Sequence, residues 1–369
     1  MKSTVEEKNV GKSMAEEEIN RGKPSADDIN LRKSKGEEIN FEEPTSDLAG
    51  LTFRTTTAED YDDVISVRRH LYDGTDYIPY RYYELLEHNT GFAGFIDCTM
   101  VCFMFAAVID DGRSIHIQSI RVREEYEGRG IYSRLRTFCL KKLNTTARKS
   151  VYVIESPTSN DQLIKKSVNL VFIRRSYTRN RITESLLFLK RSLKFESTKG
   201  TLRSMLGPRH ASSLEKVDVH YLVDLFRDKS ATQYLFPENI IVVYWIPYEL
   251  VPSNIGRMFM GTKMLSSVTP IQDPNSKTVP PMISAITVDQ CEAGSVIKLD
   301  LFGDISNEEI ITDHIYTQLE RVVDTCSEIL ILYIDVQQHV NTDTLQHVLS
   351  NMGWKMVYDD VMYGLEKYI

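Results

Sequence analysis

The chain has 369 residues, of which 42% are hydrophobic and 26% charged, and its 44 basic and 52 acidic side chains give a formal net charge of −8. This length predicts two globular domains of roughly 100–200 residues each. The negative charge argues against general nucleic-acid binding, because phosphate binding relies on clustered Lys and Arg. Five irregularly spaced cysteines argue against a disulfide framework and favour a reducing, cytoplasmic location.

Residues 92–109 form an apolar segment that is long enough to span a membrane. The segment contains Asp97, however, and a central Asp in lipid costs about 2.5–3.5 kcal/mol. The sequence around Asp97 favours a turn between two apolar strands, at residues 92–97 and 100–109. The N-terminus has no apolar stretch typical of a secretory signal. We therefore expect a protein that does not associate with membranes.

Residues 1–50 differ in composition from the rest of the chain. They carry a short acidic motif that recurs every ten residues, at 17–20, 27–30 and 37–40, and each copy contains a single Ile. Such a unit buries too little apolar surface to offset the entropy that ordering would cost. The pattern predicts a disordered charged tail.

The globular pattern begins at Leu51 with a short strand, residues 51–54. Thr57, followed three residues later by Asp60, is typical of a helix N-cap, and apolar residues recur behind it at helical spacing. Residues 110–112 (DDG) indicate a tight turn, and residues 114–122 follow as a further strand. We thus expect the order strand, helix, strand, strand, strand.

A glycine-containing loop follows this last strand. The loop contains Gly128 and Gly130, and a helix begins at Ile131 with Leu135 and Phe138 on its buried face. Glycines at the start of a helix let backbone N–H groups approach a pyrophosphate, and the helix dipole favours the anion. Arginines around the loop, such as Arg129, add positive charge. The arrangement indicates a phosphate-binding turn.

This loop resembles the coenzyme A loop of GNAT-type N-acetyltransferases, whose usual pattern is R/Q-x-x-G-x-G/A. Three more segments are similar to the histidine N-acetyltransferase family: residues 72–82 (YDGTDYIPYRY), residues 243–248 (VYWIPY) with Ser253-Asn254, and residues 299–303 (LDLFG). The resemblance implies an α/β (α+β) GNAT acyltransferase fold with a mixed, largely antiparallel sheet, followed by a family-specific C-terminal α/β domain.

The resemblance also implies an activity, the transfer of an acetyl group from acetyl-CoA to the amine of a small molecule, with L-histidine or another amino acid as acceptor. If transfer occurs, the amine proton has two candidate acceptors, Glu155 on the next predicted strand or a water held by Gln118, and the alternative role of Glu155 is that of a surface acid at a strand end. Asp76 and Tyr77 are candidates for lining the acceptor pocket, and their alternative role is to fix the turn at Gly74. The positions that the resemblance assigns to acetyl-CoA are Ile120, Arg121, Val122, Glu127, Gly128, Arg129, Gly130, Ile131, Tyr132 and Asn160.

Several positions depart from the family pattern. Tyr132 stands where Gly or Ala is usual, Gln118 where this family has Glu, and Ser167 where many GNAT enzymes have Tyr. Glu127 replaces the usual Arg or Gln. A Gln cannot accept a proton as a general base. The alternative is therefore a catalytically weak relative that binds CoA or a protein partner without turnover.

The expected domain boundaries are a tail at 1–50, a GNAT domain at 51–196, a linker and connecting segment at 197–235, and a C-terminal domain at 236–369. In the last of these, residues 240–243, 295–301 and 329–334 have the pattern of buried strands, and residues 310–323 that of a helix. The histidines and cysteines have no metal-ligand spacing, so no metal is expected. We expect the second half to wall the acceptor pocket, because ligand sites favour domain interfaces.

Overall fold

The structure is a computed structural model that describes residues 39–40, 48–69, 71–143, 146–155, 184–206, 214–267, 280–337 and 341–368. Most of the predicted tail lies outside these residues. Within the tail, Ile39–Asn40 forms the short strand β1, whose Ile39 lies opposite Phe53 of the next strand. Residues 39–369 make up one compact unit.

The first half of the described chain follows the predicted order, except that a second helix, α3 (Ile78–His88), stands before the strand that begins at Thr90. Its elements are β2 (Thr52–Thr55), α2 (Tyr61–Val67), α3 (Ile78–His88), β3 (Thr90–Ile96), β4 (Thr99–Ile109), β5 (Ser114–Val122), α4 (Ile131–Leu143) and β6 (Lys149–Glu155). A capping box stabilises the turn before α2. The Thr57 side chain accepts a hydrogen bond from a backbone N–H of the turn, and the Asp60 carboxylate accepts one from the backbone N–H of Thr57. The predicted turn at Asp97 joins β3 to β4, with φ of 48° at Asp97.

The second half holds more elements than the sequence analysis assigns. They are β7 (Glu184–Thr198), α6 (Lys199–Met205), β8 (Glu215–Lys216), α7 (Val219–Arg227), α8 (Lys229–Leu235), β9 (Ile240–Val243), β10 (Ile246–Glu249), α9 (Pro252–Met258), β11 (Thr262–Ser266), β12 (Met282–Cys291), β13 (Gly294–Gly303), α10 (Glu308–Glu320), β14 (Ile329–Gln337), α11 (Asp343–Asn351) and β15 (Lys355–Tyr368). Residues 197–235, expected as a linker, thus contain three helices with buried leucines at positions 202, 222 and 225.

One mixed, largely antiparallel sheet joins most of the described strands, in the order β1-β2-β3-β4-β5-β6-β15-β7-β14-β13-β12-β11-β8. Leaving out the edge strand β1, this order consists of two halves of six strands, β2-β3-β4-β5-β6-β15 and β8-β11-β12-β13-β14-β7. In both halves the fourth and fifth strands are parallel and the other neighbours antiparallel. The two halves therefore share the same order and direction of strands.

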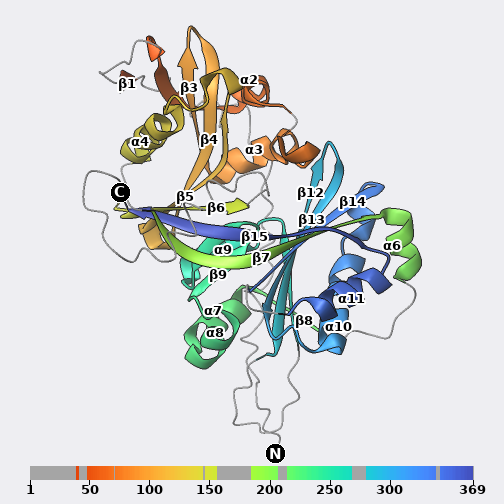
Figure 1. Cartoon of the computed structure of the whole chain (residues 1–369). Helices are drawn as coiled ribbons and strands as arrows, with labels where there is room; N and C mark the ends of the chain where they lie inside the picture. The colour runs from red at the N-terminus through yellow and green to blue at the C-terminus, as the bar shows by residue number, and fades with distance from the viewer. Residues whose placement is uncertain are drawn as a thin grey trace, which may run out of the picture. The chain divides into compact units, whose positions relative to one another are not determined.

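The sixth strand of each half comes from the other half of the sequence. β7 follows β6 in the chain but pairs with β14, whereas β15, at the end of the chain, pairs with β6. The two exchanged strands pair with each other along nearly their whole length and run side by side through the middle of the sheet (Figure 1). Strands from both sides of the expected domain boundaries, at 196 and 236, belong to this one sheet. The boundaries themselves stay a prediction.

Apolar layers on the sheet hold the helices in place. α4 packs through Ile131, Leu135 and Phe138 against the first half, where Phe138 contacts Phe53 and Phe92. α10 packs on the second half through the face predicted from the sequence, which includes Ile311, Ile315 and Leu319. Among the described residues, no helix has the length and apolar character that crossing a membrane requires.

Candidate active site

The parallel strands β5 and β6 separate soon after they begin. They pair at three positions only, from Ser114–Lys149 to His116–Val151, although β5 continues to Val122 and β6 to Glu155. The equivalent strands β13 and β14 pair at six positions, up to Asp300–Asp335. The first half thus contains an open wedge between its parallel strands. In the second half the equivalent strands stay paired for three more residues before they separate.

A β-bulge lies on β5 at the mouth of this wedge. Gln118 pairs with Phe105 and Arg121 with Phe103, so Ser119 and Ile120 together oppose a single residue of β4. Ser119 has a φ of 57°, and its hydroxyl lies 2.9 Å from the hydroxyl of Tyr77. Such bulges redirect the strand locally and are common beside active sites. The predicted residues Gln118, Ile120 and Val122 all lie along this stretch.

The glycine loop closes the end of the wedge. Gly128 and Gly130 have φ of 73° and 77°, a conformation that favours glycine, and no atom of a described residue lies within 4 Å of where a Cβ would be at either glycine. The loop is therefore open on the side from which a phosphate would approach the first turn of α4, which begins at Ile131. Tyr132, the second residue of α4, is half-buried against the apolar layer under the helix rather than fully exposed in the loop.

The charged residues near the loop are mostly paired. Arg121 is 3% exposed and binds the carboxylate of Asp76 at 3.0 and 3.1 Å. Arg121, which the resemblance assigns to acetyl-CoA binding, thus has its side chain in an ion pair with Asp76. Glu127 forms an ion pair with Arg68, which offsets the repulsion that its carboxylate would exert on a phosphate.

The side chain of Arg129 is more exposed than that of Arg121. Its guanidinium lies over the ring of Tyr126, 5.5 Å from the ring centroid, and its side chain is exposed. Tyr126 belongs to the short turn Glu124–Tyr126 between β5 and the glycine loop. The exposed guanidinium is thus held next to Gly128 and Gly130, where it can meet an anion.

A pocket opens beside Gln118, between elements of both halves of the chain. Its lining residues are Arg81, Leu85, Asn89, Gln118, Val243, Tyr244, Ile246, Tyr248, Arg257, Met260 and Thr262. Its volume is about 30 Å³, enough for about two water molecules. The side-chain amide nitrogen of Gln118 is buried and has no hydrogen-bond partner among the described residues. The second half therefore contributes part of the wall of this pocket, and the role of the pocket as the acceptor site stays a prediction.

Residues from the three family-like segments meet around this pocket. Arg81 comes from the first segment and binds Asp289 at 3.0 Å and Glu84 at 2.6 Å. Tyr244 comes from the second, and its hydroxyl donates to Asp289 at 2.6 Å. The third segment contributes Asp300. The fold thus brings together residues of segments that are far apart in the sequence.

The turn between β9 and β10 is held from two sides. The backbone N–H of Tyr244 donates to the buried carboxylate of Asp300 at 3.1 Å. On the other side, Tyr77 packs edge-on against Tyr244, with 5.8 Å between ring centroids, and stacks on Trp245 at 6.5 Å. Tyr77, predicted to bind substrate, therefore fixes the pocket wall and the bulge at Ser119 at the same time.

Burial shifts the pKa of several groups near the pocket. Desolvation raises the pKa of Tyr244 well above its usual value, and the nearby Asp289 adds to the effect. Burial likewise raises the pKa of Asp289, in spite of the attraction of Arg81. On β5, burial lowers the pKa of His116 to about 3, helped by the charge of Arg257. The tyrosine is thus neutral near pH 7, as is the imidazole.

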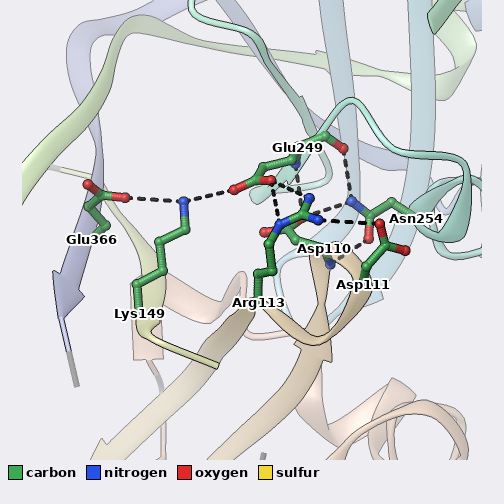
Figure 2. Close-up of polar contacts among 7 residues, drawn as sticks. All are labelled: Asp110, Asp111, Arg113, Lys149, Glu249, Asn254 and Glu366. Carbon is green, nitrogen blue, oxygen red and sulfur yellow. Dashed lines mark hydrogen bonds and ion pairs between the residues drawn. The ribbon is translucent and has the colours of Figure 1, made fainter. Parts of the chain in front are cut away.

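A polar network at the far end of β5 joins the two halves (Figure 2). Asn254 and Asp110 exchange two hydrogen bonds, of 2.8 and 2.9 Å, and both are almost fully buried. Glu249 of β10 binds Arg113 at 2.6 Å and Lys149 at 3.0 Å. The network anchors β10 and α9, which carry pocket residues, to the turn between β4 and β5.

Other predicted residues are not placed at the site. Glu155 ends β6 opposite Met362, and its side chain lies outside the described part of the structure. Asn160 and Ser167 also lie outside the described residues. No group of three or more His, Cys, Asp or Glu side chains with the arrangement of a metal site occurs in the described part of the chain.

The strand order, the wedge between β5 and β6 and the glycine loop before α4 define a GNAT acyltransferase fold. Solved structures share this fold. A tandem GNAT protein from the clavulanic acid biosynthesis pathway matches with a TM-score of 0.51 and 11% identity, over 86% of this chain and 98% of that chain. Saccharomyces cerevisiae N-myristoyltransferase with bound myristoyl-CoA matches with a TM-score of 0.51 and 9% identity, over 91% of this chain and 84% of that chain.

Sequence comparison gives a narrower relationship. Residues 210–337 match the family model described as histidine N-acetyltransferase, C-terminal. The histidine N-acetyltransferase of Oreochromis niloticus is 26% identical over 225 residues, which cover 56% of this chain and 62% of that enzyme. The chain thus spans less than two thirds of the length of this relative. The resemblance to GNAT-type enzymes of the histidine N-acetyltransferase family is therefore confirmed.

Proposed function

We propose that the protein is an N-acetyltransferase that moves an acetyl group from acetyl-CoA to the primary amine of a small molecule, with an amino acid such as L-histidine as acceptor. The observation that carries the proposal is the alignment of three features along β5: the open loop at Gly130, the wedge after His116, and the pocket at Gln118. The relatives' names support the reaction, and the fold supports the use of an acyl-CoA.

The residues present fit the phosphates and the pantetheine arm of such a co-substrate. Gly128 and Gly130 leave the first turn of α4 open to a pyrophosphate, and Arg129 supplies charge. The unpaired edge of β5 beyond His116 offers backbone groups to an extended chain, as a sheet edge does to an added strand. When bound, acetyl-CoA supplies an acetyl thioester that is activated toward an amine.

The chain's own residues would then position the two reactants. Backbone N–H groups of β5 near Ile120 can donate to the thioester oxygen, where negative charge develops. The free amide N–H of Gln118 is a donor inside the pocket. Because the pocket has room for about two water molecules, the side chains of its wall have to move when an amino acid enters.

The test is an acetyl-transfer assay with radiolabelled acetyl-CoA and the full chain, run against a panel of amino acids and small amines. We expect acetylation of at least one amino acid, lost in Gly130→Glu. Binding of acetyl-CoA without transfer to any amine would contradict the proposal and support the alternative, a relative that binds CoA without turnover.

A further inference from the structure

The pocket beside Gln118 contains two arginines whose charges are balanced differently. Arg81 is neutralised twice, because it binds Glu84 through two nitrogens, at 3.0 and 2.6 Å, and Asp289 through a third, at 3.0 Å. Its side chain is only 11% exposed, so these pairs are shielded from water. Arg81 therefore belongs to the wall of the pocket and has little charge left for a ligand.

Arg257, the other arginine, has no acidic partner among the described residues. Its guanidinium donates one hydrogen bond, of 2.8 Å, to the backbone carbonyl of His88 at the end of α3. Arg257 is half-buried and lines the pocket, and no carboxylate is among the lining residues. A guanidinium presents five donors in a plane that suits a carboxylate. The pocket thus carries one uncompensated positive charge.

The other polar groups of the pocket point to the same ligand chemistry. Gln118 contributes a buried amide nitrogen without a partner, which is another donor. The hydroxyl of Tyr244 already donates its hydrogen bond to Asp289. Asn89 donates its side-chain amide to the carbonyl of Leu85. A ligand with acceptor oxygens would accept hydrogen bonds from Arg257 and Gln118. An amine without a carboxylate would bring only positive charge, which Arg257 would repel.

From this arrangement we infer that Arg257 binds the carboxylate of the acceptor and makes the site selective for amines that carry a carboxylate. The inference rests on the proposed function. It assigns the amine to the side of Gln118 at the mouth of the wedge and the carboxylate to the side of α9. No bond forms or breaks at Arg257, which acts as a binding residue.

The test compares each accepted amino acid with the amine obtained by removing its carboxylate, with L-histidine and histamine as the first pair. For the wild type we expect kcat/KM at least tenfold higher for the amino acid. In Arg257→Gln that ratio should fall to near one, mainly through a higher KM for the amino acid, while kcat/KM for the amine changes less than threefold. Arg257→Lys, which keeps the charge without the planar fork, should retain part of the ratio.

The matched control is Arg227→Gln, because Arg227 is an exposed arginine whose one ion pair within the described residues is with Asp224 on its own helix. Its kinetics should equal those of the wild type. If Arg257 serves only to bind the carbonyl of His88, Arg257→Gln will lower kcat/KM for both acceptors by the same factor, which would overturn the inference.

The inference and the proposed function can fail separately. Transfer to amines with no preference for the carboxylate would refute the role of Arg257 and leave the proposed function intact. If no amine is acetylated, the proposed function fails, and calorimetric binding of L-histidine and histamine to the full chain decides the inference. Tighter binding of L-histidine that is lost in Arg257→Gln would support it, and equal or no binding would overturn it.

Discussion

Asn254 and Asp110 form two hydrogen bonds with each other in the interior. The backbone N–H of Asp110 donates to the side-chain oxygen of Asn254 at 2.9 Å, and the amide of Asn254 donates back to the Asp110 carboxylate at 2.8 Å. The same carboxylate also accepts from the backbone of Glu249 at 3.0 Å. One buried pair thus connects the turn after β4 with β10 and α9 (Figure 2).

This pair predicts a large effect on stability. Asn254→Asp would place a second carboxylate against Asp110 and remove the donor, so the free energy of unfolding should fall by about 2–4 kcal/mol. Urea unfolding of the full chain measures the loss. Gln233→Ala, at an exposed position on α8, is the control and should change stability by less than about 0.5 kcal/mol. Equal stability of the wild type and Asn254→Asp would refute the account of this network.

The composition of the pocket predicts a simple pH profile. Its lining contains no carboxylate and no imidazole, and burial raises the pKa of both Tyr244 and Tyr248. The acceptor amine therefore has to arrive unprotonated, so kcat/KM should rise by about tenfold per pH unit between pH 6 and 8. A plateau in this range would reveal a proton acceptor outside this lining, for which Glu155 is the first residue to test.

Gln118→Glu extends the same argument. A carboxylate at this position would lie within the pocket and could accept the amine proton, as the family's usual Glu would. We expect kcat/KM at pH 7 to increase at least tenfold and its pH dependence to flatten. The unionisable Gln118→Leu is the matched control and should show neither effect. An unchanged or lower rate in Gln118→Glu would show that the site is adapted to glutamine.

His116 predicts a loss of stability in acid. Burial lowers its pKa to about 3 in the folded state, whereas histidine in an unfolded chain titrates near 6.5. The stability that its neutral form contributes is complete above pH 6.5 and is lost as the pH falls toward 3, because only the unfolded chain takes up the proton. The advantage of the wild type over His116→Gln should shrink by up to about 1.4 kcal/mol per pH unit. Urea unfolding between pH 4 and 7 tests this, and a constant difference would contradict it.

Local sequence signals predict the elements around the glycine loop well. The strand at 114–122 coincides with β5, and the helix begins at Ile131 with the expected buried face. These features depend on patterns within about 30 residues, where periodicity and glycine positions determine the structure. The same holds for the capping box at Thr57.

The exchange of β7 and β15 could not be predicted in this way. Residues 184–198 contain two lysines, Lys190 and Lys194, and lysines are ordinarily exposed, yet these are 7% and 8% exposed. Lys190 lies over the ring of Phe302, and the charges of Asp300 and Asp335 favour its protonated form although burial lowers its pKa. These partners come from strands more than 100 residues away, so no local pattern reveals them.

The candidate site was predicted in part. Asp76 and Tyr77 lie where they affect the site, although they act through Arg121 and Ser119. The family-like segments contain Tyr244, but its place in the pocket follows from tertiary contacts. Arg257 carries no sequence signal, since a single arginine on a short helix is ordinarily solvated.

Titration calorimetry of the full chain with acetyl-CoA tests the account most directly, because in the described part of the chain the open wedge and the glycine loop belong to the first half. The account predicts micromolar binding to one site per chain. Gly130→Glu should abolish binding, and Ser306→Glu, which adds the same charge to the corresponding turn of the second half, should leave it unchanged. Two sites per chain, no binding at millimolar acetyl-CoA, or binding that survives Gly130→Glu would contradict it.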